Sequence, residues 1–275
     1  MDILLQALVL GIVQGLTEFL PVSSSGHLIL VPALLGWKDP FVDSLTFSVM
    51  LHMGTLVALL VYFWRDWVRL VPAGLAAIRD RSLGSDPDRR LAWLLVATMI
   101  PAVIAGVLLN DVIEHNVRQP GVVALLLVVG AGILWFADRT GREDKAIGDL
   151  TFRAALGIGV AQAFALFPGV SRSGISISAG RLLGLSRPEA ARFSFLMATP
   201  IIAGAGAWEG LKLVRGGSDV PVALGPLALG MLAALVSGLL AIHFLLRFLT
   251  SHRLNVFVVY RIIVAAVVVI WFLAP

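Results

Sequence analysis

Six stretches of the 275-residue chain are apolar over a length that can cross a lipid bilayer. A membrane-spanning helix needs about 20 apolar residues, and roughly 17 to 25 are tolerated. Only 14% of the residues are charged and the net charge is +4, whereas a soluble domain has about 25% charged residues. The composition excludes soluble, disordered and nucleic-acid-binding proteins and predicts an all-α polytopic membrane protein. The expected spans are residues 44–64, 91–109, 121–137, 193–213, 224–249 and 254–273.

Basic residues are unevenly distributed among the connections between these spans. Connections 65–90 and 138–153 are rich in arginine, whereas 110–120 has only one basic residue. Because basic residues concentrate in cytoplasmic loops, we expect the first and third connections in the cytoplasm and both termini outside. Three further arginines are expected at the cytoplasmic surface: Arg181, Arg187 and Arg192. The absence of cysteine excludes disulfides, a thiol nucleophile and thiolate metal ligands.

Two further apolar regions, 3–35 and 154–185, are long enough to span a membrane but are interrupted near the middle. The interruptions are TEFLPVSSSGH at 17–27 and FPGVSRSG at 167–174. Non-helical backbone at membrane depth is tolerated only where protein or a water-filled cavity surrounds it. We therefore expect two re-entrant helix hairpins, each of which enters and leaves by the same face. Two ordinary spans with proline kinks are the alternative.

The two interruptions superimpose without a gap when the sequence is shifted by 148 positions. Gln14 then matches Gln162, and one Ser-x-Ser-Gly segment matches the other. The single membrane domain divides into halves 1–137 and 154–273, each consisting of one hairpin followed by three spans. Because three is odd, an inverted-topology repeat is expected, with the hairpin tips meeting near the midplane. Many secondary transporters have this architecture, so both a transporter and an enzyme stay open.

The first hairpin tip contains groups expected of a functional site. Glu18 lies four residues after Gln14, so the two share a helix face, and a carboxylate at membrane depth is by default a functional-site hypothesis. The alternative is a buried acid satisfied by hydroxyls or an arginine. At the start of the helix that follows, hydroxyls and free backbone N–H groups are expected to form an anion-binding site. The residues there are Ser23, Ser24, Ser25 and Gly26. His27 is a candidate acid, base or nucleophile. The other histidines are expected to be ordinary core residues: His52, His115, His243 and His252.

The second tip supplies a positive charge. Arg172 occupies the position that matches Ser24, and an arginine at membrane depth without an anionic partner costs about 2.5 to 3.5 kcal/mol. Its planar guanidinium suits a pair of phosphate oxygens, although a structural ion pair with Glu18 is the alternative. Hydroxyls and glycines around it allow an anion to approach: Gly169, Ser171, Ser173 and Gly174. Together the tips suit phosphoryl transfer or phosphate-ester hydrolysis, in which positioning and charge neutralisation dominate catalysis.

The motifs GIVQGLTEFLPVSSSGH at 11–27 and PGVSRSG at 168–174 resemble the signatures of the bacterial undecaprenyl-diphosphate phosphatase family, which is associated with bacitracin resistance. The resemblance covers nearly the whole chain. It implies hydrolysis of the lipid carrier undecaprenyl diphosphate to undecaprenyl phosphate and phosphate, in the cytoplasmic (inner) membrane with the active site on the outer side. The family's signature positions match Gln14, Glu18, His27 and Arg172, with Gln14 where many members have Glu.

The resemblance also implies stimulation by a divalent cation, Mg²⁺ or Ca²⁺. Glu18 is the one carboxylate at the tips, so a cation is expected to be weakly held rather than enclosed by many oxygen ligands. The expected partners are a polyprenyl diphosphate substrate and membrane lipids, without nucleic acid, and a homodimer is left open.

We therefore expect the prenyl chain among the spans and the diphosphate at the hairpin tips. Arg172, Gln14, the serines and backbone N–H groups bind phosphate in this hypothesis. Ser24 attacks the terminal phosphorus with His27 as its base, and Glu18 moves the proton or holds the cation. His27 or a positioned water is the alternative nucleophile. The main alternative function is a transporter or flippase of a lipid-linked phosphate, because a structural scaffold would leave the buried charges unexplained.

Overall fold

The computed structural model describes residues 2–215 and 221–273, and its regular elements there are all helices. The hairpin helices are α1 (Ile3–Phe19), α2 (Ser24–Leu35), α7 (Phe152–Ala163) and α8 (Arg172–Leu182). The longer helices are α3 (Leu45–Tyr62), α5 (Pro87–Asn116), α6 (Pro120–Thr140), α9 (Arg187–Val214), α10 (Leu224–Phe248) and α11 (Asn255–Leu273). An additional helix, α4 (Trp64–Arg79), and the 3-10 turns η1 (Ile147–Asp149) and η2 (Phe164–Leu166) complete the described part. The side chains of residues 110–116, and with them His115, lie outside it.

The six long helices α3, α5, α6, α9, α10 and α11 are each long and apolar enough to cross a membrane. They coincide with the six predicted spans, which confirms the prediction of an all-α polytopic membrane protein. Helices suit this solvent because every backbone N–H and C=O group within them is bonded inside the segment.

α4 lies within the stretch 65–90 that the sequence predicts to be a connection. Its large apolar side chains recur three or four residues apart and are exposed on one stripe: Trp64, Val68, Val71, Leu75 and Ile78. Arg65 and Arg69 lie between them in the sequence. A strongly amphipathic helix of this kind has low mean hydropathy, and for that reason a search for uninterrupted apolar spans misses it.

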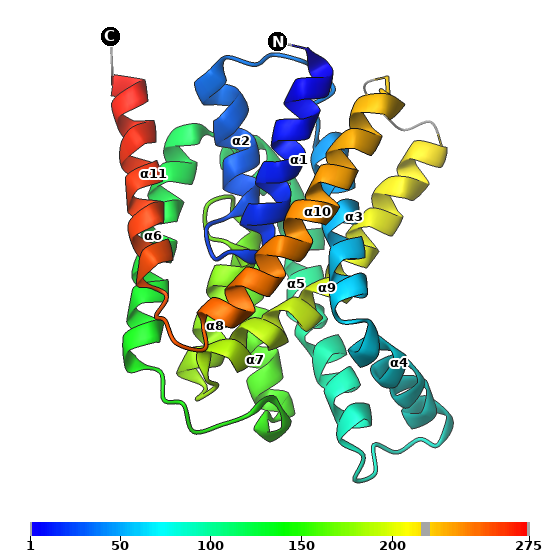
Figure 1. Ribbon diagram of the computed structural model, residues 1–275. Helices are drawn as coiled ribbons and strands as arrows, with labels where there is room; N and C mark the ends of the chain where they lie inside the picture. Colours follow the sequence, from blue (N-terminus) through cyan, green and yellow to red (C-terminus); the bar gives the residue numbers. More distant parts are fainter. Residues whose placement is uncertain (1, 216–220, 274–275) are drawn as a thin grey trace.

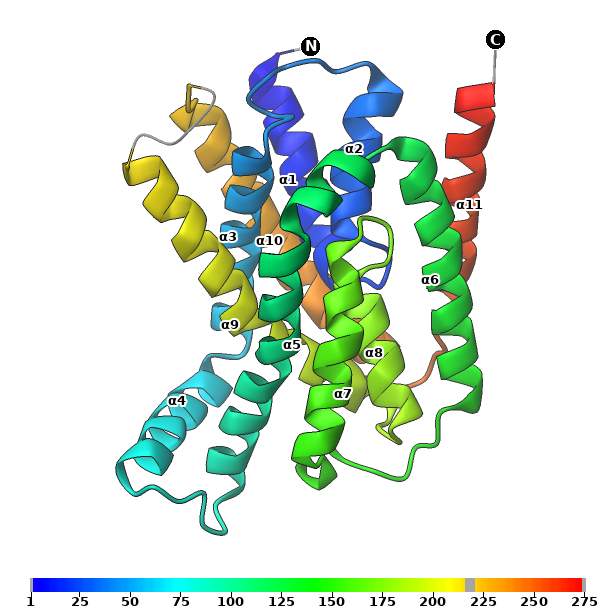
Figure 2. The same ribbon diagram turned by 180° about the vertical axis from the view of Figure 1, so that it is seen from behind.

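The two interrupted regions are hairpins that enter the bundle from opposite ends (Figures 1 and 2). α1 descends from the end that holds both termini and α2 returns to it, whereas α7 and α8 start and finish at the end near α4 (Figure 2). The chain thus reverses at each interruption instead of continuing as a kinked span, and both tips lie in the interior. The equivalence of the two halves as an inverted repeat stays a prediction.

Small residues set the position of α1 against α10. A Cβ atom on Gly11 would lie 2.3 Å from the Gly230 carbonyl oxygen, and one on Gly15 would lie 2.0 Å from Ser237 Oγ. Small residues four apart let two helix backbones approach closely in a membrane. Because α10 also packs on α3, this contact fixes the first hairpin relative to α3 and places Glu18 in the interior.

The prediction that Arg181 lies at the cytoplasmic surface is wrong. Its side chain is 1% exposed and donates to the carbonyl oxygens of Gly141 at 2.9 Å and Leu185 at 2.8 Å. Arg181 lies in the last turn of α8, where a cation is favoured because the terminal carbonyl groups are negative. The other two arginines reach acids: Arg187 Nε lies 2.5 Å from Asp138 Oδ1, and Arg192 Nη2 lies 2.7 Å from Asp66 Oδ1.

Candidate active site

Each hairpin tip ends in a serine that caps the helix that follows. Ser23 and Ser171 have φ angles of 78° and 76°, in the left-handed region that residues other than glycine seldom adopt. Ser23 Oγ accepts from the Gly26 amide and Ser171 Oγ accepts from the Gly174 amide. The two tips therefore have the same local conformation. Helix N-termini built in this way are suited to bind anions.

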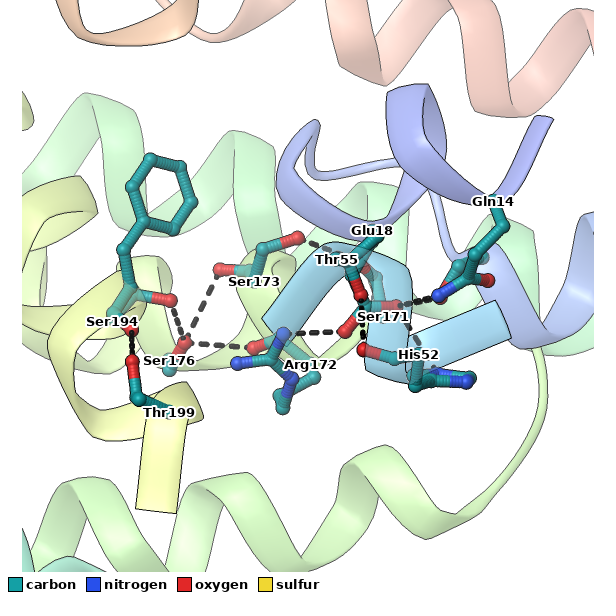
Figure 3. A network of polar contacts seen from close by, with 12 residues as sticks. Gln14, Glu18, His52, Thr55, Ser171, Arg172, Ser173, Ser176, Ser194 and Thr199 are labelled. Carbon is teal, nitrogen blue, oxygen red and sulfur yellow. Dashed lines mark hydrogen bonds and ion pairs between the residues drawn. The ribbon is translucent and has the colours of Figure 1, made fainter. Parts of the chain in front are cut away.

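Glu18 is the centre of the polar network between the tips (Figure 3). Its Oε1 lies 2.5 Å from Arg172 Nη2, and its Oε2 accepts from the Ser24 hydroxyl. Gln14 Nε2 donates to Oε2 at 3.1 Å, and His52 Nε2 lies 3.3 Å from the same oxygen. The carboxylate is 3% exposed, so its charge is balanced by these neighbours rather than by water. Glu18 is thus a buried acid paired with an arginine and a hydroxyl, as the alternative expected, and it also borders a cavity, so its functional role stays a prediction.

Three of the predicted phosphate-binding residues join the two hairpins to each other. The Gly169 amide donates to Ser23 Oγ at 3.0 Å, and Ser173 Oγ donates to the Leu20 carbonyl oxygen at 3.0 Å. Gly169 has a φ of 108°, and a Cβ atom there would lie 2.6 Å from the Val123 carbonyl oxygen. These residues hold the tips in register. Ser171 Oγ lies 3.2 Å from Ser173 Oγ and also borders the cavity.

A cavity of about 280 Å³ lies between the tips and the helices α3, α5 and α9. Its polar lining residues come from α3 and from the two hairpins: Glu18, Ser24, Ser25, His52, Gln162, Ser171 and Arg172. The residues that α5 and α9 contribute to the lining are all apolar: Ala102, Val103, Ile201, Ile202 and Ala205. Arg172 Nη1 is buried without a hydrogen-bond partner. A cavity with an unpaired guanidinium nitrogen beside an apolar wall suits an amphiphile with an anionic head.

His27 does not line this cavity, and its ring nitrogens bond other groups. Its Nδ1 lies 2.7 Å from the Ser23 carbonyl oxygen and its Nε2 lies 2.8 Å from the Tyr260 hydroxyl. Since a carbonyl oxygen only accepts, Nδ1 carries the hydrogen, and in the neutral ring Nε2 then accepts from Tyr260. Both ring nitrogens are thus engaged with groups other than Ser24. The structure does not bring His27 to the serine that it is predicted to deprotonate.

Arg261 supports the second tip from α11 and was not among the predicted site residues. It is fully buried and donates to the carbonyl oxygens of Gly169, at 2.9 Å, and Val170. The absence of a side chain on Gly130 of α6 makes room for it, because a Cβ atom there would lie 2.7 Å from Arg261 Nη1. An ionisable residue in a membrane span is by default a functional-site hypothesis. The sequence therefore contained a signal for Arg261, because this residue lies within the predicted span 254–273.

Among the described residues, the side chains at the tips do not enclose a metal ion with the ligands that a resident site would need. The described part of the chain holds no group of three or more His, Asp or Glu side chains that could bind a metal ion. Ca²⁺ takes six to eight oxygen ligands, and Mg²⁺ demands near-octahedral coordination. Both Glu18 oxygens already face donors from Arg172 and Ser24. Glu18 is nevertheless the one carboxylate bordering the cavity.

Comparison with known proteins gives one consistent family. The family described as bacitracin resistance protein BacA matches residues 7–267. An undecaprenyl-diphosphatase from Desulforudis audaxviator is 48% identical over 265 residues, which cover 96% of this chain and 96% of the relative. Undecaprenyl-diphosphatases from Thermomicrobium roseum and Moorella thermoacetica are each 47% identical, again over 96% of both chains.

Proposed function

Because the chain belongs to the bacitracin resistance protein BacA family, we propose that it hydrolyses undecaprenyl diphosphate to undecaprenyl phosphate and inorganic phosphate. The observation that carries the proposal is the single cavity where Glu18, Ser24 and Arg172 meet beside an apolar wall. The proposed nucleophile, Ser24, and the anion-binding group, Arg172, thus each contact the same proton acceptor, Glu18. The relatives named above are undecaprenyl-diphosphatases.

The lining residues of the cavity indicate where each end of the substrate binds. The diphosphate lies beside the polar residues, where Arg172 Nη1 has no protein partner and the N-termini of α2 and α8 favour negative charge. The prenyl chain lies against the apolar residues of α5 and α9, such as Val103 and Ile202. An arginine nitrogen in a site of low dielectric stabilises the charge that develops during phosphoryl transfer.

Ser24 is the nucleophile in this mechanism, and Glu18 rather than His27 is its proton acceptor. The Ser24 hydroxyl already donates to Glu18 Oε2. Its proton passes to Glu18 as Oγ bonds to the terminal phosphorus, and the bond from that phosphorus to the bridging oxygen breaks. Undecaprenyl phosphate leaves, and water then hydrolyses the phosphoserine. His27 positions the first tip through its bond to the Ser23 carbonyl oxygen.

The reaction returns the lipid carrier for synthesis of cell-wall polymers. Removal of the diphosphate form also accounts for bacitracin resistance, the property named by the family. We place the protein in the cytoplasmic membrane with the cavity opening to the outer side. The arginine-rich connections 65–90 and 138–153 support this orientation, because cytoplasmic loops carry an excess of basic residues.

Release of inorganic phosphate by the purified protein in detergent tests the proposal. We expect release from undecaprenyl diphosphate by the unaltered protein and none by Ser24→Ala. A transporter or flippase of a lipid-linked phosphate would release no phosphate in micelles, where there are no two compartments. That result, from protein that is folded by its thermal unfolding curve, would overturn the proposal. Assays with and without a chelator show whether a divalent cation is required.

A further inference from the structure

His52 lies in the reactive part of the cavity although it belongs to neither hairpin. It projects from the middle of α3, borders the cavity beside Ser24, and places Nε2 3.3 Å from Glu18 Oε2. The Ser24 hydroxyl donates to that same oxygen. The nucleophile and the imidazole therefore share one carboxylate oxygen, and the mechanism above leaves the imidazole unused.

The hydrogen-bond partners of His52 place a hydrogen on both ring nitrogens. Nδ1 lies 2.7 Å from the Ser48 carbonyl oxygen, which can only accept, so Nδ1 is a donor. Glu18 accepts from Arg172 through Oε1 and from Ser24 through Oε2, which is the pattern of an ionised carboxylate. Nε2 must then also be a donor toward Glu18. The pair is an imidazolium beside a carboxylate, with a proton available on the side of the cavity.

We propose that His52 is the general acid of the reaction, an inference that rests on the proposed function. As Ser24 Oγ bonds to the terminal phosphorus, its proton passes to Glu18. The bond from phosphorus to the bridging oxygen breaks, and that oxygen takes the proton from His52 Nε2 as undecaprenyl phosphate leaves. Glu18 is then protonated beside a neutral imidazole, and its proton passes to Nε2 and restores the pair.

The same two groups serve the second half of the reaction. Water gives a proton to Glu18 as it attacks the phosphoserine phosphorus. The bond from phosphorus to Ser24 Oγ breaks, and Oγ takes the proton from His52. Inorganic phosphate leaves and the Glu18 proton returns to Nε2. Each half thus uses one base, one acid and the short path between them, and the site ends in its starting protonation state.

The charged groups around His52 come from the two hairpins. Glu18 on α1 and Arg172 on α8 border the same cavity. α9 presents only apolar side chains there, and its acid Glu209 bonds Thr46 near the start of α3 at 2.7 Å. On α10, His243 lies 3.4 Å from the Tyr62 hydroxyl at the other end of α3, about 15 Å along the helix axis from position 52.

The experiment compares His52→Gln, His52→Ala and the control His243→Gln with the unaltered protein, using phosphate release from undecaprenyl diphosphate across pH. A glutamine keeps an N–H donor toward Glu18 but cannot transfer a proton. We expect kcat to fall about 100-fold, with KM changed less than about threefold and thermal unfolding unchanged. A general acid must be protonated, so the unaltered protein loses activity on the alkaline side. His52→Gln should lack that decline, and His243→Gln should retain it.

Chemical rescue separates proton donation from a structural role. Imidazole added to His52→Ala fills the vacated space and supplies the missing acid, so we expect it to raise kcat at least about tenfold, in proportion to the imidazolium fraction. Unchanged kcat and an unchanged alkaline decline in His52→Gln would overturn the inference, as would absence of rescue in a folded His52→Ala. If the unaltered protein releases no phosphate, the proposed function itself fails, which is a distinguishable result.

Discussion

Ser24 and Arg172 are the first residues of α2 and α8, and each binds one oxygen of the Glu18 carboxylate. The two helices belong to hairpins that enter the bundle from opposite ends (Figures 1 and 2). A single buried acid therefore joins the two tips. One hairpin contributes the hydroxyl and the acid, and the other contributes the positive charge, so neither is a complete site alone.

Arg172→Ala should remove most phosphate release, because Arg172 borders the cavity and its Nη1 has no hydrogen-bond partner in the protein. Loss of one such donor typically lowers the rate by about 10²- to 10³-fold. Arg172→Lys should recover part of the activity, since an ammonium keeps the charge but not the planar pair of donors. Steady-state phosphate release measures both. Near-normal release by a folded Arg172→Ala protein would contradict the role of this residue in binding phosphate.

Glu18→Gln should strongly lower turnover while preserving the shape of the site. The amide can still accept from Arg172 but cannot take the Ser24 proton, and loss of a general base costs about 10²- to 10⁴-fold. Glu209→Gln is the matched control, because Glu209 is also buried but bonds Thr46 near the start of α3 instead of a residue of the hairpin tips. We expect it to stay active. Equal losses in both variants would indicate a general effect on folding.

Ser24 should carry the phosphoryl group during turnover. Rapid acid quench and peptide mapping of the unaltered protein are expected to locate phosphate on Ser24. Ser24→Ala should form no phosphoenzyme, whereas Ser25→Ala should still form one at Ser24, because Ser25 Oγ lies 3.5 Å from Ser23 Oγ and, among the described residues, is not hydrogen-bonded to Glu18. A phosphorylated His27 or Ser25 in the unaltered protein would refute the assignment of the nucleophile.

Gly15→Ala should destabilise the fold by disturbing the contact between α1 and α10. The added Cβ would lie 2.0 Å from Ser237 Oγ and 2.5 Å from the Ala234 carbonyl oxygen. Overpacking of this kind costs about 1–3 kcal/mol. Gly132→Ala in α6 is the control, because nothing lies within 4 Å of its added Cβ, and it should not lower stability. Thermal unfolding in detergent compares the two, and equal unfolding temperatures would contradict the proposed packing.

Much of the fold is predictable because hydropathy and helix length are local properties. All six spans were expected near their observed bounds, and the contact of Gln14 with Glu18 follows from their spacing of four residues. α4 was missed because its charges lower its mean hydropathy below that of a span. Arg181 was misplaced because its burial depends on the loops that cover the end of α8, as shown by its bond to Gly141.

The site was less predictable where it depends on helices remote from the motifs. His52 on α3 looks like an ordinary core histidine in the sequence, and only the packing of α3 against α1 brings it to Glu18. Tyr260 similarly gives no local sign that it binds His27. The next residue, Arg261, could have been identified from the sequence, because a lone arginine in an apolar span requires a partner. Here that partner is the second hairpin tip.

A double-mutant cycle between the hairpins tests most directly whether both tips form one phosphate-cleaving site. The measurement is kcat/KM for phosphate release in Glu18→Gln, Arg172→Gln and the double variant. Residues that act as a unit have strongly non-additive effects. We predict that the double variant is impaired no more than about tenfold beyond the worse single variant. Losses that multiply fully would contradict a shared site.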